Sequence, residues 1–333
     1  MKKGTNIFKG EKAVFDYLSP GSIGPTPVVE LSSKLNPFKK DGVHIYIKLA
    51  QSVPLSNIKY LPSWYMLDGI PKNKLKGIKN LVEYSSGNTV MSLAILSRHF
   101  GIPNMHAIIT SDVPKNKQNF LKLVGANIIV SDGPASPDVG ANIGGIYDAK
   151  KMGEKAGWYN LNQYVNPDNP KASGEIIGKE VFSQFGGELS IFTTSLGTGG
   201  TIVGAAKYLK SKIKNLFVMT AYIKKGFSIP GPRGELAVKK LAFPWHEHVD
   251  QELKITTKPA FARSLELIRE GFFVGPSTGM QLHGILEFLK SEKKKKRLSK
   301  YKNKKGEINI VFVAADTMFP YIENYFEILG KNL

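Results

Sequence analysis

The feature that most constrains the fold is an alternation of short, β-branched apolar runs with segments of helical periodicity, which begins near residue 44. This alternation is typical of α/β folds, in which helices connect parallel strands. Most of the runs are almost continuously apolar, as strands covered on both faces require. The expected strands are 44–49, 80–84, 106–110, 127–131, 190–194, 216–221, 271–274 and 308–314.

Between these runs, apolar residues recur with a spacing close to 3.6, which predicts amphipathic helices. The expected helices are 90–99, 115–123, 174–184, 202–209, 262–270, 280–289 and 321–329. The strands fall into one group before residue 135 and another after 185, so two sheets are expected. The stretch 131–145, rich in Gly, Pro and Asp, is interpreted as a boundary or a loop.

The chain contains no cysteine, which excludes disulfides, Cys-ligated zinc, iron-sulfur clusters and thiolate nucleophiles. The N-terminal residues 1–12 have no apolar core of a signal peptide, and no run approaches about 18 apolar residues. We therefore expect a cytoplasmic protein without a membrane partner. The histidines are scattered, and His246 and His248 have the wrong spacing for two ligands on one helix face, so no metal site is expected.

A net charge of +19 would attract nucleic acid, anionic lipid or anionic metabolites. The densest basic run, 291–305, lies between a predicted helix and a predicted strand and is interpreted as a solvated connection. A nucleic-acid or partner surface is the alternative. Tyr301 is the only aromatic residue of the run, whereas stacking platforms need several, so nucleic acid is not the expected partner.

A glycine-rich turn at 196–204, LGTGGTIVG, lies between a predicted strand and a predicted helix. Its glycines allow backbone N–H groups to approach an anion, and a helix N-terminus follows, as in a phosphate-binding loop. The residues that would bind are Gly197, Thr198, Gly199, Gly200 and Thr201. The pattern is neither the dinucleotide fingerprint nor a Walker A motif, and a turn without a ligand explains it equally well.

Three further turns carry polar residues that have a simpler reading. Residues 83–90, EYSSGNTV, place small polar side chains at a helix start, which suits a carboxylate but also ordinary N-capping. Ser277 in 270–280, EGFFVGPSTGM, has the same two readings. Lys59 in 54–59, PLSNIK, is on position alone a surface lysine of a basic chain.

Taken together, the four turns occur in the order and approximate spacing of the cysteine synthase and cystathionine β-synthase family, the fold type II pyridoxal-phosphate (PLP) enzymes. The opening 24–28, GPTPV, resembles the family's G-N-T-P-L, and 54–59 matches N-P-x-x-S-x-K in part. Residues 85–89 resemble T-S-G-N-T, and 197–201 match G-T-G-G-T in full. The stretch 228–233, SIPGPR, resembles the S-I-P-G-x-R of B-type O-acetylserine sulfhydrylases.

The resemblance implies a role for each matching residue. Lys59 would hold PLP as a Schiff base and, once released as a free amine, take the substrate's α-proton. Residues 197–201 would bind the cofactor's phosphate, Asn88 its phenolic oxygen, and Ser277 its pyridine nitrogen. The substrate-binding residues would be Ser85, Ser86, Gly87, Thr89, Gln163 and Arg233.

The resemblance also implies two domains, each a mostly parallel twisted sheet flanked by helices, as in the β subunit of tryptophan synthase. We expect a smaller α/β domain at 43–150 and a larger, PLP-phosphate-binding domain made of 1–42 and 151–333. The site is expected at the carboxyl ends of the strands, where open α/β sheets bind ligands. A homodimer is expected from the family.

The chain departs from the family pattern around the lysine, where Tyr60 and Leu61 replace Asp-Arg, and Leu55 and Ser56 replace two glycines. Val90 replaces the glycine after the carboxylate loop. These departures bear on the amino-acid substrate more than on the cofactor.

The expected reaction is β-replacement on O-acetylserine or O-phosphoserine with sulfide or another thiol, giving L-cysteine or a relative. A neutral Ser277 at the pyridine nitrogen favours β-elimination over transamination, and Arg233 is assigned to an anionic leaving group. The alternatives are cystathionine or diaminopropionate synthesis, serine/threonine dehydration, a catalytically silent PLP-fold scaffold, and a basic nucleic-acid-binding protein.

Overall fold

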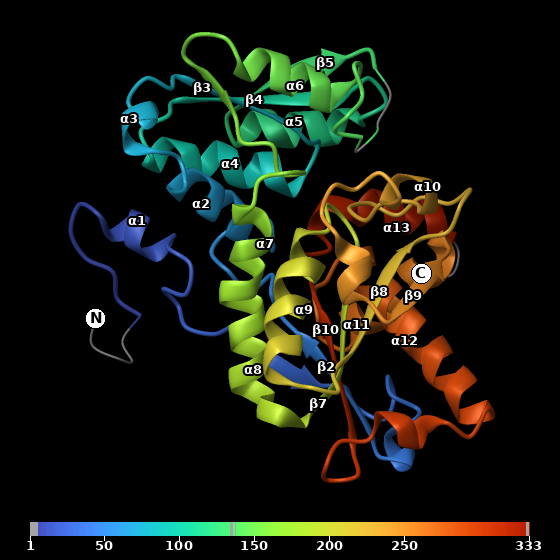
Figure 1. Cartoon of the computed structure of the whole chain (residues 1–333). Coiled ribbons are helices and arrows are strands. Elements are labelled where there is room, and N and C mark those ends of the chain that lie inside the picture. The colour runs from blue at the N-terminus through green and yellow to red at the C-terminus, as the bar shows by residue number, and fades with distance from the viewer. Residues whose placement is uncertain (1–5, 134–135, 137, 331–332) are drawn as a thin grey trace. The chain divides into compact units, whose positions relative to one another are not determined.

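The computed structural model describes residues 6–133, 136, 138–330 and 333. The chain forms two compact units, each built on its own sheet (Figure 1). Unit 1 comprises Met1–Thr26 and Ser52–Asn169, and unit 2 comprises Pro27–Gln51 and Pro170–Leu333. The sheets are mostly parallel and flanked by helices, which confirms the predicted α/β class.

Unit 1 contains a sheet of four parallel strands in the order β5-β4-β3-β6. Its strands are β3 (Asn80–Tyr84), β4 (Asn104–Thr110), β5 (Ala126–Ser131) and β6 (Trp158–Asn160). Its helices are α1 (Ala13–Tyr17), α2 (Tyr60–Asp68), α3 (Lys72–Leu75), α4 (Asn88–His99), α5 (Lys115–Leu123) and α6 (Gly145–Gly153). Helix α2 packs on α4, and α4, α5 and α6 pack on the sheet. All the strands run in one direction, so the loops after them share one edge.

Unit 2 contains a six-stranded sheet in the order β1-β2-β10-β7-β8-β9, in which only the β1–β2 pair is antiparallel. Its strands are β1 (Val28–Glu30), β2 (Val43–Lys48), β7 (Leu189–Ser195), β8 (Phe217–Ile223), β9 (Gln251–Ile255) and β10 (Ile308–Val313). Its α-helices are α7 (Asp168–Ser173, which begins in unit 1), α8 (Lys179–Phe185), α9 (Gly200–Lys212), α10 (Glu235–Val238), α11 (Thr257–Arg269), α12 (Pro276–Lys294) and α13 (Ile322–Leu329). A π-helical turn, Gly174–Gly178, joins α7 to α8, and the 3₁₀ turns are Lys39–Asp41, Gly186–Glu188, Trp245–His248, Leu298–Tyr301 and Phe319–Tyr321.

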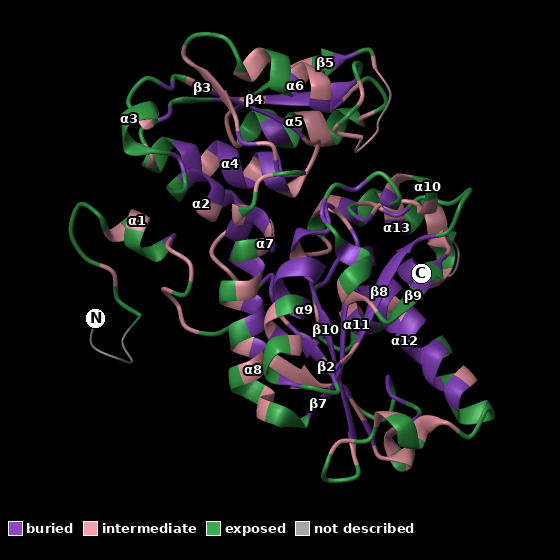
Figure 2. Ribbon diagram, in the orientation of Figure 1, coloured by how far each residue is buried: buried purple, intermediate pink, exposed green. Residues whose placement is uncertain are grey.

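The central strands β7 and β10 of unit 2 are buried along almost their whole length because helices cover both faces (Figure 2). The six residues of β10, INIVFV, are all buried. Lys48 at the end of β2 is a buried residue with an ionisable side chain. The side chain is fully buried, and its Nζ lies 2.6 Å from Oε2 of Glu180 on α8. Burial lowers the pKa of Lys48, while the contact with Glu180 opposes that shift.

The structure divides the chain differently from the expected domains. Residues 43–51 were placed in the smaller domain, but β2 pairs with β10 along all six of its residues and so belongs to unit 2. Residues 1–26 and 151–169 were placed in the larger domain and belong to unit 1, because β6 pairs with β3. Short β6 has too little apolar pattern for its pairing to be predicted.

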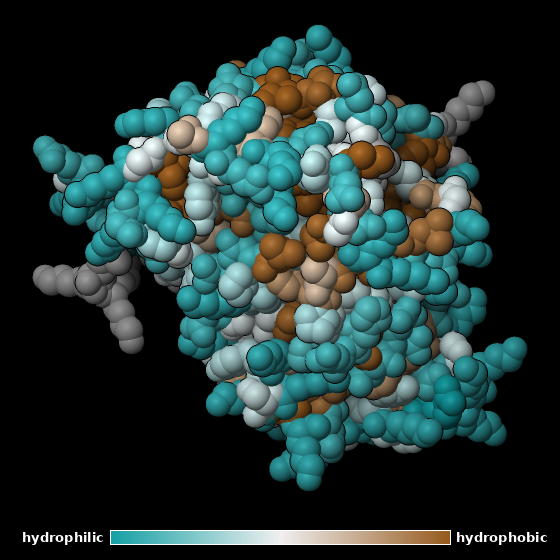
Figure 3. All heavy atoms as spheres, turned by 45° about the horizontal axis from the view of Figure 1, so that its top comes forward, coloured by the Kyte–Doolittle hydropathy of each residue, from teal (hydrophilic) through white to brown (hydrophobic). Residues whose placement is uncertain are grey.

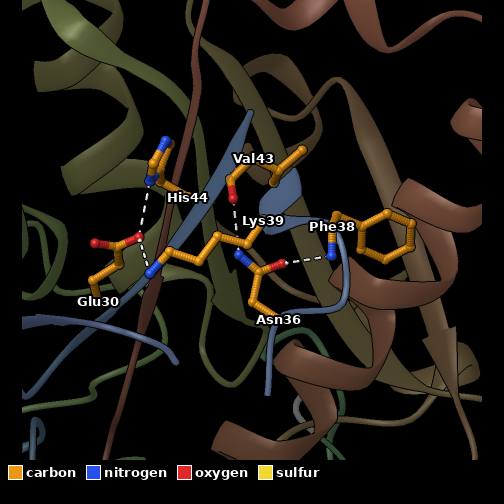
Figure 4. Close-up of polar contacts among 6 residues, drawn as sticks. All are labelled: Glu30, Asn36, Phe38, Lys39, Val43 and His44. Atoms are coloured by element: carbon orange, nitrogen blue, oxygen red, sulfur yellow. Dashed lines mark hydrogen bonds and ion pairs between the residues drawn. The ribbon is translucent and has the colours of Figure 1, made fainter. Parts of the chain in front are cut away.

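Polar contacts hold the segment that enters β2 (Figure 4). Oε1 of Glu30 lies 2.8 Å from Nδ1 of His44 and 3.2 Å from Nζ of Lys39. The Asn36 side chain donates from Nδ2 to the Val43 carbonyl oxygen at 2.8 Å, and its Oδ1 accepts from the Phe38 N–H at 3.1 Å. The corner between β1 and β2 is therefore a fixed part of the six-stranded sheet.

The expected strand 271–274 is wrong. Gly271 has φ +94° and ends α11, and the N–H of Val274 bonds the carbonyl oxygen of Phe272 within a tight turn. The run lies in a loop that leads into α12, where Val274 is buried, Phe272 is half-buried and Phe273 is 55% exposed, so an apolar run alone does not make a strand here.

The structure tests two interpretations, that of 131–145 as a boundary or a loop and that of 291–305 as a solvated connection. In the stretch 131–145, residues 134, 135 and 137 lie outside the described residues, and the stretch is internal to unit 1 rather than a boundary. In the basic run 291–305, α12 continues to Lys294 and a 3₁₀ turn follows. The lysines of the run are exposed, as a solvated connection predicts, while Glu292 is buried and accepts hydrogen bonds from Arg297 and Tyr301.

Hydrophilic side chains cover most of the face shown in Figure 3, and hydrophobic side chains gather in a few areas of it. Across the described residues, no helix combines the length and the apolar character needed to span a bilayer.

Candidate active site

The predicted carboxylate loop, Ser85–Thr89, follows β3 at the carboxyl edge of the unit 1 sheet. Helix α4 begins at Asn88 with Gly87 as its N-cap, and the Ser85 hydroxyl accepts from the Gly87 N–H at 3.3 Å. Ser86 is half-buried. The first-turn N–H groups of a helix have no partner within it and carry partial positive charge. This loop can therefore bind a carboxylate.

Gln163 lies just after β6, and β6 is the neighbour of β3 in the sheet. The structure brings it into contact with the carboxylate loop, because Oγ1 of Thr89 donates to its Oε1 at 2.8 Å. Its Nε2 donates to the carbonyl oxygen of Tyr84 at 3.3 Å. The two contacts fix the orientation of the amide, since a flipped amide would place two oxygens together.

Lys59 is the residue before α2, and its side chain is half-buried. The preceding turn is held by Asn57, which donates to the Leu55 carbonyl oxygen at 2.8 Å and accepts from Ser92 on α4 at 3.3 Å. Ser56 has φ +53°, the left-handed conformation that favours glycine. The chain thus keeps a glycine-type turn at a position where the family has glycine.

The residues that replace the family's Asp-Arg serve the packing of unit 1. Tyr60 and Leu61 are both 1% exposed. The Tyr60 hydroxyl donates to the carbonyl oxygen of Leu18 at 2.5 Å, and burial raises its pKa. This departure therefore ties the N-terminal segment to the helix that Lys59 precedes.

The predicted phosphate loop, Gly197–Thr201, follows β7 at the carboxyl edge of the unit 2 sheet. Helix α9 begins at Gly200, and Gly199 caps it with φ +92°, a conformation that requires glycine. The Gly200 N–H bonds the Thr198 hydroxyl at 3.3 Å. The N–H groups of a glycine turn and a helix start are the usual donors to a phosphate.

Arg233 lies beside this loop through its backbone. Its N–H donates to the carbonyl oxygen of Leu196 at 2.8 Å, and its own carbonyl oxygen accepts from Ile223 at 3.0 Å. The Arg233 backbone is therefore bonded to Leu196, the residue that precedes Gly197.

Ser277 lies in the first turn of α12, and it is 4% exposed. Among the described residues its Oγ has no hydrogen-bond partner. The Gly275 N–H bonds the carbonyl oxygen of Asp316, which comes just after β10. Strands β10 and β7 are parallel neighbours, so Ser277 and the phosphate loop share one edge of the sheet.

The predicted residues thus form two groups, one in each unit, and their chemistry fits PLP. A buried hydroxyl without a partner costs about 1–3 kcal/mol, and a ligand's ring nitrogen would offset that cost. The backbone donors at Gly197–Thr201 suit the phosphate, and Lys59 supplies an amine. No cluster of three or more His, Asp or Glu side chains suited to a metal ion occurs within the described residues.

Glu83 is a buried residue whose place in the site the sequence did not reveal. It lies in β3 just before the carboxylate loop and is 1% exposed. Burial raises its pKa to about 8, although N–H donors from Gln163 and Asn162 oppose the rise. The only signal in the sequence is a carboxylate inside an otherwise apolar strand.

The comparisons with known proteins agree with this chemistry. The family model described as pyridoxal-phosphate dependent enzyme matches residues 20–302. Cysteine synthase B of Salmonella typhimurium is 29% identical over 267 residues, which cover 80% of this chain and 85% of that protein. Cysteine synthase of Aquifex aeolicus is 28% identical over 296 residues, covering 87% and 86%.

Two solved structures share the fold. O-ureido-L-serine synthase matches with a TM-score of 0.76 at 22% identity, over 92% of this chain and 93% of that one. A hydrogen sulfide-producing enzyme from Fusobacterium nucleatum matches with a TM-score of 0.73 at 24% identity, over 90% and 96%. Because the family model spans most of the sequence, the chain belongs to the pyridoxal-phosphate dependent enzymes and is similar to their cysteine synthases.

Proposed function

We propose that this chain catalyses β-replacement on an activated L-serine, either O-acetylserine or O-phosphoserine, with sulfide as the nucleophile and L-cysteine as the product. The observation that carries the proposal is the buried, uncharged Ser277 hydroxyl, which has no hydrogen-bond partner among the described residues. Such an uncharged group beside the cofactor's ring nitrogen would leave that nitrogen unprotonated, which would limit charge build-up and favour departure of a β-substituent. The similarity to two cysteine synthases supports the same reaction class.

The chain's residues divide the work between cofactor and substrate. When bound, PLP supplies an electron sink for the substrate's α-carbon. Lys59 holds the cofactor and, as a free amine, takes the α-proton. The loop Gly197–Thr201 binds the phosphate through its N–H groups, and Asn88 serves the phenolic oxygen.

The substrate's carboxylate is assigned to Ser85–Thr89 and Gln163. The first turn of α4 offers N–H donors and the positive end of a helix of 12 residues. Oε1 of Gln163 accepts from Thr89, and one hydrogen of its Nε2 is donated to the Tyr84 carbonyl oxygen. The second Nε2 hydrogen is left for the substrate. The loop thereby orients the β-carbon of the substrate without contacting it.

Arg233 is assigned to an anionic leaving group, because a guanidinium binds phosphate oxygens in a bidentate manner. Its backbone bond to Leu196 fixes it beside the phosphate loop. A leaving phosphate would gain more from this contact than a leaving acetate. Arg233 is therefore the residue that would distinguish the two activated serines.

The test is a matrix of substrates and nucleophiles with the PLP-loaded protein. O-acetylserine and O-phosphoserine are each offered with sulfide, with homocysteine, with hydroxyurea and with water alone. The nucleophile hydroxyurea is included because a protein of this fold is an O-ureido-L-serine synthase. Cysteine formation from either serine supports the proposal, whereas pyruvate alone would assign elimination, and no turnover would favour a silent scaffold.

The Arg233 assignment has its own control. Arg233→Ala should lower kcat/KM for O-phosphoserine more than for O-acetylserine, whereas Arg263→Ala, which removes a surface pair with Glu266, should change neither. An equal loss on both substrates would contradict the assignment.

A homodimer and a cytoplasmic location are proposed from the family resemblance alone, and sedimentation of the purified protein tests the first.

A further inference from the structure

Glu83 receives hydrogen bonds from one short segment of unit 1. Its Oε2 accepts from the Asn162 N–H at 2.9 Å and from Nδ2 of Asn160 at 3.3 Å, and its Oε1 accepts from the Gln163 N–H at 3.4 Å. The side chain is 1% exposed, so water does not compete for these donors. One carboxyl group thus accepts hydrogen bonds from three residues between the end of β6 and Gln163.

These contacts begin where the sheet ends. The β3–β6 ladder stops at the pair Val82 and Asn160, where β6 ends, so the N–H groups after Asn160 lie outside the ladder. The side-chain oxygens of Glu83, the next residue of β3, accept from the N–H groups of Asn162 and Gln163 instead. Asn162 also has φ +52°, the left-handed conformation, which asparagine adopts more readily than most non-glycine residues.

The same segment carries Gln163, whose polar groups are all engaged. Its carbonyl oxygen accepts from Nδ2 of Asn169 at 2.6 Å, its N–H binds Glu83, and its amide bridges Tyr84 and Thr89. A path of direct contacts therefore runs from the Glu83 carboxyl to the Thr89 hydroxyl in the first turn of α4. Glu83 reaches the carboxylate loop in this way although its own oxygens are occupied by the segment after β6.

We propose that Glu83 is a positioning residue for the amino-acid substrate, which it serves by fixing Gln163 and, through Gln163, Thr89. The inference rests on the proposed function, since it assumes that the loop Ser85–Thr89 binds the substrate carboxylate. It adds a residue that makes no contact with the substrate. Without the Glu83 carboxyl, residues 160–163 would lose the hydrogen-bond acceptor that fixes the position of Gln163 and of its side-chain amide.

The test uses Glu83→Gln, which keeps the size of the side chain but turns one acceptor into a donor that faces N–H groups. The PLP-loaded proteins are titrated with L-serine, the part common to all the candidate substrates, and its Kd is read from the visible spectrum at pH 9, above the raised pKa of Glu83. We expect the Kd for L-serine to rise roughly tenfold, as loss of one hydrogen bond's worth of binding implies. The Kd for PLP should change less than about twofold, and KM should rise more than kcat falls.

Glu292→Gln is the matched control. Glu292 is also a buried carboxylate that accepts several hydrogen bonds, but its donors are Arg297 and Tyr301, in unit 2. Both variants are expected to be less stable than the unaltered protein, and only Glu83→Gln should weaken the binding of L-serine. If both variants weaken L-serine binding to the same extent, the effect is a general loss of stability and the inference is overturned.

A second variant keeps the inference testable if Glu83→Gln does not fold. Asn160→Ala removes one donor to Glu83 at a half-buried position, and it should raise the Kd for L-serine by about twofold to threefold, as part of one hydrogen bond. Amide hydrogen exchange of residues 160–164 in the PLP-free protein should be faster in either variant. Unchanged exchange and unchanged Kd overturn the inference, whereas failure of the unaltered protein to bind PLP or L-serine overturns the proposed function and the inference with it.

Discussion

Thr89 and Gln163, 74 positions apart in the sequence, are joined by a hydrogen bond of 2.8 Å from a hydroxyl to a side-chain amide oxygen. Both residues are buried, and each is 3% exposed. The bond connects the start of α4 with the segment after β6, and so connects two of the sequence motifs that were assigned to substrate binding. Its donor and acceptor roles are fixed by the Tyr84 carbonyl oxygen on the other side of the amide.

Thr89→Val should destabilise unit 1, because it leaves the buried Oε1 of Gln163 without its donor. The expected loss is about 1–3 kcal/mol in the free energy of unfolding, whereas Thr89→Ser keeps the hydroxyl and should lose less. Urea unfolding of the PLP-free proteins measures both. A loss for the serine variant as large as that for the valine variant would contradict the prediction, because the serine variant keeps the hydrogen bond and loses only the methyl group.

The raised pKa of Glu83 predicts a dependence of stability on pH. Between about 4.5 and about 8 the carboxyl is ionised in the unfolded chain but keeps its proton in the folded one, so the free energy of unfolding falls as pH rises across this window. Glu83→Gln has no proton to lose there. We expect the stability of the unaltered protein relative to this variant to decline from pH 5 to pH 8, and a constant difference would contradict the assignment of the raised pKa.

Ser56→Gly should stabilise the turn before Lys59. Ser56 adopts φ +53°, where a side chain costs about 1–2 kcal/mol, and glycine removes that cost while adding some entropy to the unfolded chain. The expected gain is about 1 kcal/mol or less. Ser56→Ala is the control, because it keeps the Cβ atom and should bring no gain, and the urea midpoints of the three proteins give the comparison.

Lys48→Met tests the buried pair in unit 2. It leaves the Glu180 carboxylate, whose side chain is 14% exposed, without the cation 2.6 Å away, and the expected loss is about 3 kcal/mol. Lys179→Met removes an exposed pair with Glu175 nearby in sequence and should lose about 0.5 kcal/mol or less. Similar losses in the two variants would mean that burial does not strengthen the Lys48 contact.

The elements that the sequence predicted are those whose apolar pattern matches their burial, either on one face or on all sides. The helix 115–123 was predicted with its observed bounds, and β10 within one residue, because one is amphipathic and the other is apolar except for Asn309. Helix α2 was missed, since seven of its nine residues are buried and no polar face marks a helical period. Strands β1 and β6 have three residues each, too few for a pattern, and their place depends on pairing with distant strands.

For the site, the turns were predictable and the contacts between them were not. The glycine loop 197–201 was found because backbone approach to an anion demands glycine, and Gly199 has the positive φ that fits this reading. Gln163 was found only through the family resemblance. Glu83 was missed because its role depends on where the chain goes after β6, which no local pattern records.

The central claim is that Lys59 carries PLP, and reductive trapping tests it most directly. The protein is incubated with PLP, reduced with borohydride, digested, and the modified peptide is identified by mass spectrometry. The account predicts that the pyridoxyl group is found on Lys59 and is lost in Lys59→Ala, while Lys72→Ala, at an exposed lysine of the same unit, is labelled like the unaltered protein. Labelling spread over surface lysines, or labelling that survives Lys59→Ala unchanged, would contradict it.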